Sequence, residues 1–335
     1  MGKNKKNNAV VTEAHLHLPA HKQAEAAATP VIDTHTHLMT TFSAYKSKYH
    51  AGKYDDLWAF VRGMYEGRNV SAIVDVWCEA PVRTAWKEVA DSALSVEDRE
   101  RRWGGIEYWF VLGESNASVS GLSATNEARR YTDEVESHIL EAMTHPRCVG
   151  WGEIGLDYHY DNSVSNRQLQ QKVFTRQLRH AVKLGRALTI HTREAEEDTE
   201  RILKEEVPAQ HKIHIHCFTD SPAFAQRLLD HFPNLYIGIT GVITYTTNLN
   251  TSDIVRQMAM SSQNGPRILL ETDAPFMVPS NIYASLPEVK GRLPLCHTAM
   301  IPWTADFTAG VAKQGWDAAK LMTRANDNAR LVYGI

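Results

Sequence analysis

Short apolar runs alternate with longer amphipathic stretches from Val31 to the end of the sequence. The short runs are rich in Val, Ile and aromatic residues, which is typical of strands that are buried on both faces. The pattern predicts eight strands, at residues 31–37, 72–78, 108–112, 148–154, 188–191, 213–216, 235–239 and 268–273.

The longer stretches between these runs favour helices. Apolar residues recur near helical spacing over residues 167–184, and Gly185 provides the stop. Another helix is expected after Ser221-Pro222, a cap followed by a first-turn proline. Two more are expected, within residues 194–208 and around residues 318–331.

Eight strands separated by helices predict a (β/α)8 TIM barrel, an α/β fold, as one domain over residues 31–335. A doubly wound open sheet is the alternative, but it would place a Gly-rich phosphate loop after the first strand. This chain has His35 and His37 there instead. Residues 1–30 are rich in Asn, Lys and Ala without apolar periodicity, and predict a disordered N-terminal tail.

Composition narrows the class of protein. An apolar fraction of 43% in 335 residues suffices for a sizeable core. No apolar run approaches the roughly 20 residues of a membrane helix, so no membrane association is expected. The net charge of −3 argues against a broad basic footprint for nucleic acid, while leaving room for a local phosphate site. Four distant cysteines without a CxxC pair indicate a reducing compartment, so the expected location is cytoplasmic or nuclear.

Side chains that bind metals stand at the ends of several predicted strands. Residues two apart in a strand point to the same side, so His35 and His37 can converge on one ion. A second pair of this spacing, His15 and His17, lies in the predicted tail with no strand leading into it, and is interpreted as incidental.

Further ligand-type residues end four later strands, and in a barrel these ends open onto the face that carries active sites. The joint pattern therefore predicts a metal centre. Residues nearer the strand exits are favoured over those one layer deeper, where a hydrogen-bonded core residue is the usual alternative. The candidates are Glu153, His191, His216 over His214, and Asp273 over Glu271.

Seven segments together resemble the TatD family of metal-dependent deoxyribonucleases, within the wider amidohydrolase-like barrels. The resemblance extends from about Val31 to the C-terminus. The segments are IDTHTHL at 32–38, GEIGLDY at 152–158, IHTREA at 190–195, HCFT at 216–219, GITG at 238–241, ETDAP at 271–275 and NAR at 328–330.

The resemblance implies a centre of two divalent metal ions, either Mg, Mn or Zn. Such a pair lowers the pKa of a bound water and offsets charge on a phosphodiester. Glu153 would bridge the ions, and Asp273 would orient the water or accept its proton, which makes both residues catalytic. The implied ligands are His35, His37, Glu153 and Asp273 for one ion, and Glu153, His191 and His216 for the other.

Substrate contacts are less constrained by the pattern. Arg193 is a candidate phosphate clamp, with a structural salt bridge as the alternative. The family usually carries Gly-x-His-Pro-His after its third strand, whereas this chain has Gly113-Glu-Ser-Asn-Ala. Ser115 and Asn116 are therefore expected to donate hydrogen bonds to substrate in place of the missing histidines.

The segment at residues 39–69 is longer than the fold requires and carries Phe42, Tyr45, Tyr49 and Trp58. These aromatic side chains either stack on unpaired bases or pack the rim of the barrel, which is the commoner role.

The leading hypothesis is a deoxyribonuclease of exonuclease type that acts on single-stranded DNA ends. An alternative keeps the metals but hydrolyses a carboxyl ester, such as that of a D-aminoacyl-tRNA. A third is a barrel that acts mainly as a protein-interaction partner, against which the complete ligand set argues.

Overall fold

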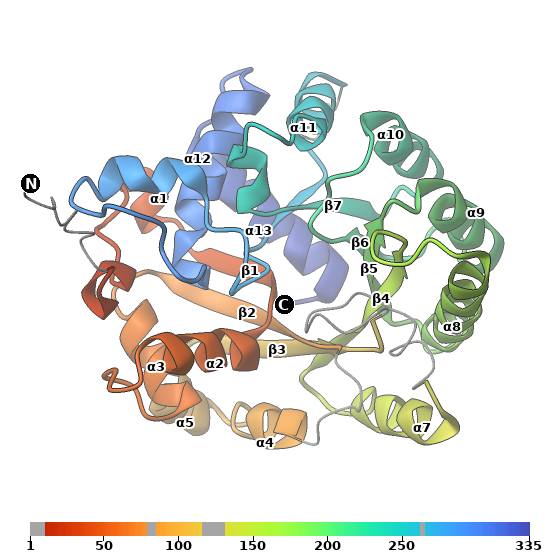
Figure 1. The fold of residues 1–335 in the computed structure, drawn as a ribbon, viewed down its shortest axis with the longest axis horizontal. Helices are drawn as coiled ribbons and strands as arrows, with labels where there is room; N and C mark the ends of the chain where they lie inside the picture. Colours follow the sequence, from red (N-terminus) through yellow and green to blue (C-terminus); the bar gives the residue numbers. More distant parts are fainter. Residues whose placement is uncertain (1–10, 79–84, 116–130, 262–264) are drawn as a thin grey trace, which may run out of the picture.

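The computed structural model describes residues 11–78, 85–115, 131–261 and 265–335. Eight parallel strands form its centre and helices surround them (Figure 1). All eight strands expected from the sequence are confirmed. They are β1 (Val31–Thr36), β2 (Val70–Trp77), β3 (Glu107–Leu112), β4 (Cys148–Asp157), β5 (Ala187–Arg193), β6 (Ile213–Ile215), β7 (Leu235–Ile239) and β8 (Ile268–Leu270).

The strands follow one another around the sheet in chain order, and the first and last approach each other. The backbone N–H of Asp273, just after β8, donates to the carbonyl oxygen of His35 in β1 at 2.9 Å. The Thr34 hydroxyl donates to the carbonyl of Leu270 at 3.1 Å. The sheet is thus a nearly closed barrel, which confirms the TIM-barrel prediction over the open doubly wound sheet.

The four helices expected from the sequence are confirmed as α8 (Val164–Lys183), α9 (Glu196–Glu206), α10 (Pro222–His231) and α13 (Ala318–Tyr333). The Ser221 hydroxyl caps α10 by accepting from the backbone N–H of Phe224, with Pro222 in the first turn. Among the described residues, no helix has the length and apolarity needed to cross a membrane. The helices described after β1 include α2 (Leu38–Lys48), α3 (Leu57–Tyr65), α4 (Ala85–Asp91), α5 (Val96–Asp98), α7 (Asp133–Ala142), α8 (Val164–Lys183), α9 (Glu196–Glu206), α10 (Pro222–His231), α11 (Asn250–Ser261), α12 (Ile301–Ala312) and α13 (Ala318–Tyr333). The shorter helical turns are η2 (Arg99–Trp103), η3 (Gly241–Thr244), η4 (Ser280–Ser285) and η5 (Thr298–Met300).

Strands β4 and β5 are in unusually close backbone contact. Gly155 pairs with His191, and a Cβ at Gly155 would lie 1.8 Å from the carbonyl oxygen of His191. Only glycine allows this approach. It fixes the position of β5 relative to β4, which also carries Glu153.

The prediction of a disordered tail is wrong for residues 11–30. This segment forms η1 (Glu13–Leu16) and α1 (Ala24–Ala28), and α1 packs against α13. The side chains of Leu16 and Leu18 are buried in the main core. A His297 ring nitrogen lies 3.0 Å from the carbonyl oxygen of Leu16. The few apolar residues of this segment form no periodic pattern in the sequence, so the prediction missed them. Leu16 and Leu18 are nevertheless buried because they pack against the barrel.

Candidate metal centre

Strand β1 brings its two histidines to the carboxyl end of the barrel. The Nε2 atom of His35 lies 3.4 Å from Oε2 of Glu153 and 3.7 Å from Oδ1 of Asp273. The Nε2 atom of His37 lies 3.3 Å from the same Asp273 oxygen and 3.9 Å from the same Glu153 oxygen. These four side chains therefore form one cluster of donor atoms.

A second cluster lies on the other side of Glu153. The Nδ1 atom of His191 is 3.0 Å from Nε2 of His216. These two nitrogens are 3.3 and 3.4 Å from Oε1 of Glu153. One carboxylate oxygen of Glu153 thus faces each cluster, which is the geometry expected of a bridging ligand. The six residues implied by the family resemblance lie together, and their role as ligands stays a prediction.

Neighbouring side chains hold these groups in place. The Asp157 carboxylate lies 3.3 Å from Nε2 of His191, and the Ser115 hydroxyl donates to Glu153 at 3.1 Å. Partners of this kind fix the ring orientation and raise the basicity of metal-binding histidines. The contact of Asp157 was missed in the sequence, although Asp157 stands in the GEIGLDY segment.

Asp33 links β1 to the segment that follows β8. Its carboxylate accepts hydrogen bonds from the backbone N–H of Thr272 at 3.0 Å and from the Thr272 and Thr298 hydroxyls, both at 2.7 Å. The arrangement fixes the positions of His35 and Asp273 relative to each other, because each lies within two residues of this network.

The electrostatics of the clusters suit a divalent cation. Burial would raise the pKa values of the Glu153 and Asp273 carboxyls, but the surrounding imidazoles outweigh burial and lower both. Burial and the nearby His216 lower the pKa of His35 to about 3. Burial would lower the pKa of His37, but the hydrogen bond and charge of Asp273 outweigh it and raise this pKa to about 9, so His37 would release a proton when a metal binds. The two ionised carboxylates and the neutral His35 already have the protonation states that metal binding requires.

The donor atoms also lie close enough together to hold a metal ion. His35, Glu153 and His216, and separately His35, His37 and Asp273, present donor atoms within 4.8 Å of one another. The His35 Nε2 atom is buried and makes no regular hydrogen bond within the described part of the chain. Imidazole nitrogens and carboxylate oxygens accept zinc, manganese or magnesium.

The deeper candidates, His214 and Glu271, pair with each other. Nε2 of His214 lies 2.8 Å from Oε2 of Glu271, and Nδ1 lies 2.8 Å from the Tyr333 hydroxyl. That hydroxyl lies 2.7 Å from the Thr189 hydroxyl. His214 and Glu271 therefore belong to a buried network that runs to the last helix, rather than to the two clusters.

Backbone strain concentrates around the centre. Asp273 and Cys217, which directly follows His216, have φ angles of 51° and 44°. Non-glycine residues rarely adopt this left-handed conformation, and those that do often lie at functional sites.

A cavity of about 530 Å³ opens over the two clusters, and its size is typical of small-ligand sites. Arg193 lines it, and its guanidinium lies 5.4 Å from the Tyr160 ring centroid. Among the residues that the structure describes, Arg193 makes no ion pair, so the salt-bridge alternative lacks support. Its role as a phosphate clamp stays a prediction. The cavity is lined by His37, Glu153, Asp157, Tyr160, His191, Thr192, Arg193, His216, Cys217, Thr219, Val242, Asp273, Phe276 and Met277.

The other candidate substrate contacts are placed differently. Ser115 is 1% exposed and its hydroxyl is engaged with Glu153, while Asn116 lies outside the described residues. Their substrate-binding role stays a prediction. The aromatic side chains of the extended segment pack against the core: Tyr45 is buried, and Phe42, Tyr49 and Trp58 are partly buried against it.

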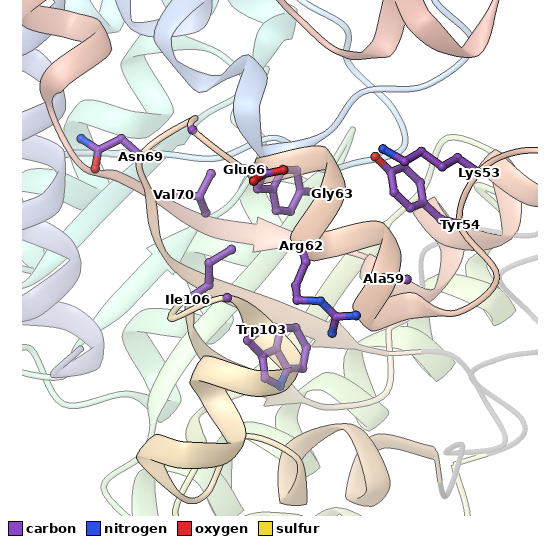
Figure 2. Close-up of a pocket in the computed structure, with 13 residues that line it drawn as sticks. Lys53, Tyr54, Ala59, Arg62, Gly63, Glu66, Asn69, Val70, Trp103 and Ile106 are labelled. Carbon is purple, nitrogen blue, oxygen red and sulfur yellow. The ribbon is translucent and has the colours of Figure 1, made fainter.

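A larger cavity, of about 1020 Å³, lies at the opposite end of the barrel (Figure 2). Val70 begins β2 and Ile106 precedes β3, so this cavity adjoins the amino ends of the strands. Its Arg62 guanidinium already donates to the carbonyls of Arg101 and Arg102, at 3.2 and 2.8 Å. None of the expected metal ligands lines it.

A TIM barrel with histidines and carboxylates clustered at the carboxyl ends of its strands defines the class of metal-dependent hydrolases. The family model described as TatD related DNase matches residues 106–334. The chain belongs to this family, as its sequence motifs predicted.

Two curated relatives illustrate the similarity. The chain is 43% identical over 159 residues to the human 3'-5' RNA nuclease TATDN2, a match covering 48% of this chain and 20% of that protein. It is 34% identical over 148 residues to the uncharacterized metal-dependent hydrolase YabD of Bacillus subtilis, covering 44% of this chain and 54% of that one. The matches thus span only part of each relative.

Solved structures agree with the fold. YJJV, a TatD homolog from Escherichia coli, superposes with a TM-score of 0.65 at 19% identity, covering 91% of this chain and 98% of that one. An uncharacterized amidohydrolase from Saccharomyces cerevisiae gives a TM-score of 0.68 at 18% identity, covering 91% and 100%.

Proposed function

We propose that this protein is an exonuclease that hydrolyses phosphodiester bonds at the ends of single-stranded DNA. The observation that carries the proposal is the position of Glu153, whose two carboxylate oxygens face separate histidine clusters beneath a cavity. Two divalent ions held by these residues would stabilise both the attacking and the leaving oxygen of a phosphodiester.

Each side chain of the centre has a proposed role. His35, His37 and Asp273 would hold one ion, His191 and His216 the other. When bound, the two divalent ions supply a low-pKa water and neutralise phosphate charge. Asp273 lines the cavity and its lowered pKa keeps it ionised, so it is able to accept the proton of the attacking water.

Arg193 is proposed to bind the phosphate. Arg193 lines the same cavity as Glu153 and Asp273, and its guanidinium offers paired N–H donors that match phosphate oxygens. Two bound divalent ions would add four positive charges at the barrel mouth. Attraction of a single-strand end would therefore come from the centre itself, and the net charge of −3 does not oppose it.

RNA is a second candidate substrate. The observation that favours it is the 43% identity with a relative named as a 3'-5' RNA nuclease. Both nucleic acids present the same phosphodiester to the centre, so the choice depends on contacts with the 2'-hydroxyl position.

The test combines metal analysis with end-labelled oligonucleotides. Purified protein is expected to hold about two divalent ions per chain and to shorten single-stranded DNA with magnesium or manganese. RNA of the same sequence tests the second candidate, and shortening of RNA alone would favour it over DNA. Glu153→Ala should abolish shortening, whereas Glu205→Ala, which removes a solvent-exposed carboxylate on α9, should not. No shortening by the native protein, or equal shortening by Glu153→Ala, would refute the proposal. A D-aminoacyl-tRNA substrate in parallel tests the ester alternative.

A further inference from the structure

Two aromatic side chains stand exposed at the mouth of the metal-centre cavity. Tyr160 is 57% exposed and Phe276 is 42% exposed, and both line the cavity. Across the described ranges of the chain, they are the only aromatic residues among the exposed large hydrophobic side chains. An exposed aromatic surface beside a polar site is typical of a binding surface rather than of a fold requirement.

The two rings come from opposite sides of the barrel. Tyr160 follows β4, and Phe276 follows β8. In a closed ring of eight strands in chain order, these two are four strands apart in either direction. A substrate end that enters the cavity between them would therefore meet one aromatic side chain on each side.

The loop that carries Phe276 is firmly held. The Phe276 N–H donates to the carbonyl of Asp273 at 3.0 Å, and the Tyr245 hydroxyl donates to the carbonyl of Val278 at 3.0 Å. A Cβ at Gly241 would lie 1.9 Å from the carbonyl oxygen of Met277, so glycine allows this loop to pack against η3. Phe276 is thus kept exposed by a fixed backbone.

Tyr160 is also positioned by its neighbours. The Arg193 guanidinium lies 5.4 Å from its ring centroid, and Nη1 donates to the Tyr160 hydroxyl at 3.4 Å. The His159 ring meets it edge-on, with centroids 5.0 Å apart. Tyr160 therefore lies next to Arg193, the proposed phosphate-binding group.

We infer that Tyr160 and Phe276 bind the unpaired bases next to the scissile phosphate by stacking, and so select single-stranded ends. The inference rests on the proposed nuclease function and adds the residues that determine its specificity. Every base offers a stacking face when unpaired, whereas bases inside a duplex are covered by their neighbours. Stacking on one aromatic side chain is worth about 5- to 150-fold in affinity per base.

The test compares two single-stranded oligonucleotides that differ only in their terminal nucleotides, which carry either bases or abasic tetrahydrofuran units. Native protein should favour the base-bearing end by at least about 5-fold in kcat/KM, which is the contribution of one stacked base. The Tyr160→Ala and Phe276→Ala variants should each reduce this ratio, and together bring it near one. Tyr160→Phe keeps the ring and should keep the ratio. Leu249→Ala, which removes an exposed side chain outside the cavity, should behave as native.

Binding provides an independent readout. A terminal 2-aminopurine in an oligonucleotide with phosphorothioate linkages should lose fluorescence on binding to native protein, and lose less with the alanine variants. Equal native rates on both oligonucleotides, or an unchanged ratio and unchanged quenching in the double variant, would overturn the inference while leaving the nuclease proposal intact. Absence of cleavage of either oligonucleotide by native protein would instead refute the nuclease proposal.

Discussion

The His-x-His pairs of β1 and β6 have the same spacing but different surroundings. His35 in β1 and His37 directly after it both reach the carboxylates of the metal centre. In the β6 pair, His216 reaches the centre, whereas His214 lies between Glu271 and Tyr333 in the barrel interior. Spacing alone therefore determines the side of a strand to which a histidine points, but not its depth.

Depth follows from the stagger of the strands. In a TIM barrel, side chains of alternate strands form successive layers, and β1 and β6 belong to different sets. The His35 ring stacks on that of His216, with centroids 3.9 Å apart and planes within 4°. His214 meets His35 edge-on at 6.3 Å, one layer below. Each histidine of the β6 pair also has its own carboxylate neighbour, Glu153 for His216 and Glu271 for His214.

The largest expected effect is on the β1 pair. His35→Ala removes a buried donor that faces both Glu153 and Asp273, so we expect loss of bound metal and a decrease of more than about 100-fold in kcat/KM on a single-stranded oligonucleotide. Elemental analysis and the end-labelled assay measure these two quantities. A variant with native metal content and activity would place His35 outside the centre.

His214→Leu tests the deeper member of the β6 pair. Burial raises the pKa of Glu271 to about 8 and lowers that of His214, so both side chains are neutral near pH 7, with Nε2 of His214 2.8 Å from Oε2 of Glu271. The leucine removes the polar contact of Oε2 of Glu271, while Oε1 keeps the backbone N–H of Cys217. The variant should decrease the free energy of unfolding by about 1–3 kcal/mol, with metal content retained. Urea denaturation measures the first quantity. Loss of metal equal to that of His35→Ala would contradict the distinction between layers.

Tyr333→Phe tests the same network from the last helix. The variant loses the hydroxyl that contacts Nδ1 of His214 and the Thr189 hydroxyl, but keeps the ring. We expect a decrease of about 0.5–1.5 kcal/mol in the free energy of unfolding, smaller than for His214→Leu. If His214 and Tyr333 act in one network, the double variant should lose less free energy of unfolding than the sum of the two single losses. A double-mutant cycle measures this difference.

The smallest effect is expected for a third pair with this spacing, His15 and His17. Nε2 of His17 lies 3.2 Å from the Tyr54 hydroxyl, and Nδ1 of His15 accepts from the backbone of Thr12. His17→Ala should therefore change the free energy of unfolding by less than about 1 kcal/mol. Metal content should be native, and any loss of bound metal would show that this pair is not incidental.

The sequence predicted most of the architecture, because each buried strand carries its own apolar run and each of the four expected helices carries its own period or cap. It also placed the six candidate ligands together, since strand ends in a barrel share one face. It missed the contact of Asp157 with His191, because β4 continues to Asp157, beyond its predicted end at Ile154, and this extension sets the direction of the Asp157 side chain. Tyr160 and Phe276 were missed for a related reason: exposure of a loop residue is set by packing around it, not by local pattern.

The packing of Leu16 and Leu18 into the core could not be predicted from the sequence, and it has a consequence for the order of folding. The contact of Leu16 with His297 spans 281 residues, and the hydrogen bond from Asn326 to the carbonyl of Pro30 spans 296. On the ribosome, a segment that is synthesised early must wait for the last helix before it finds its place. Contacts so distant in sequence form late and slowly. Docking of this segment is thus expected to accompany the final closure of the barrel, with Leu16 and Leu18 exposed to chaperones until then.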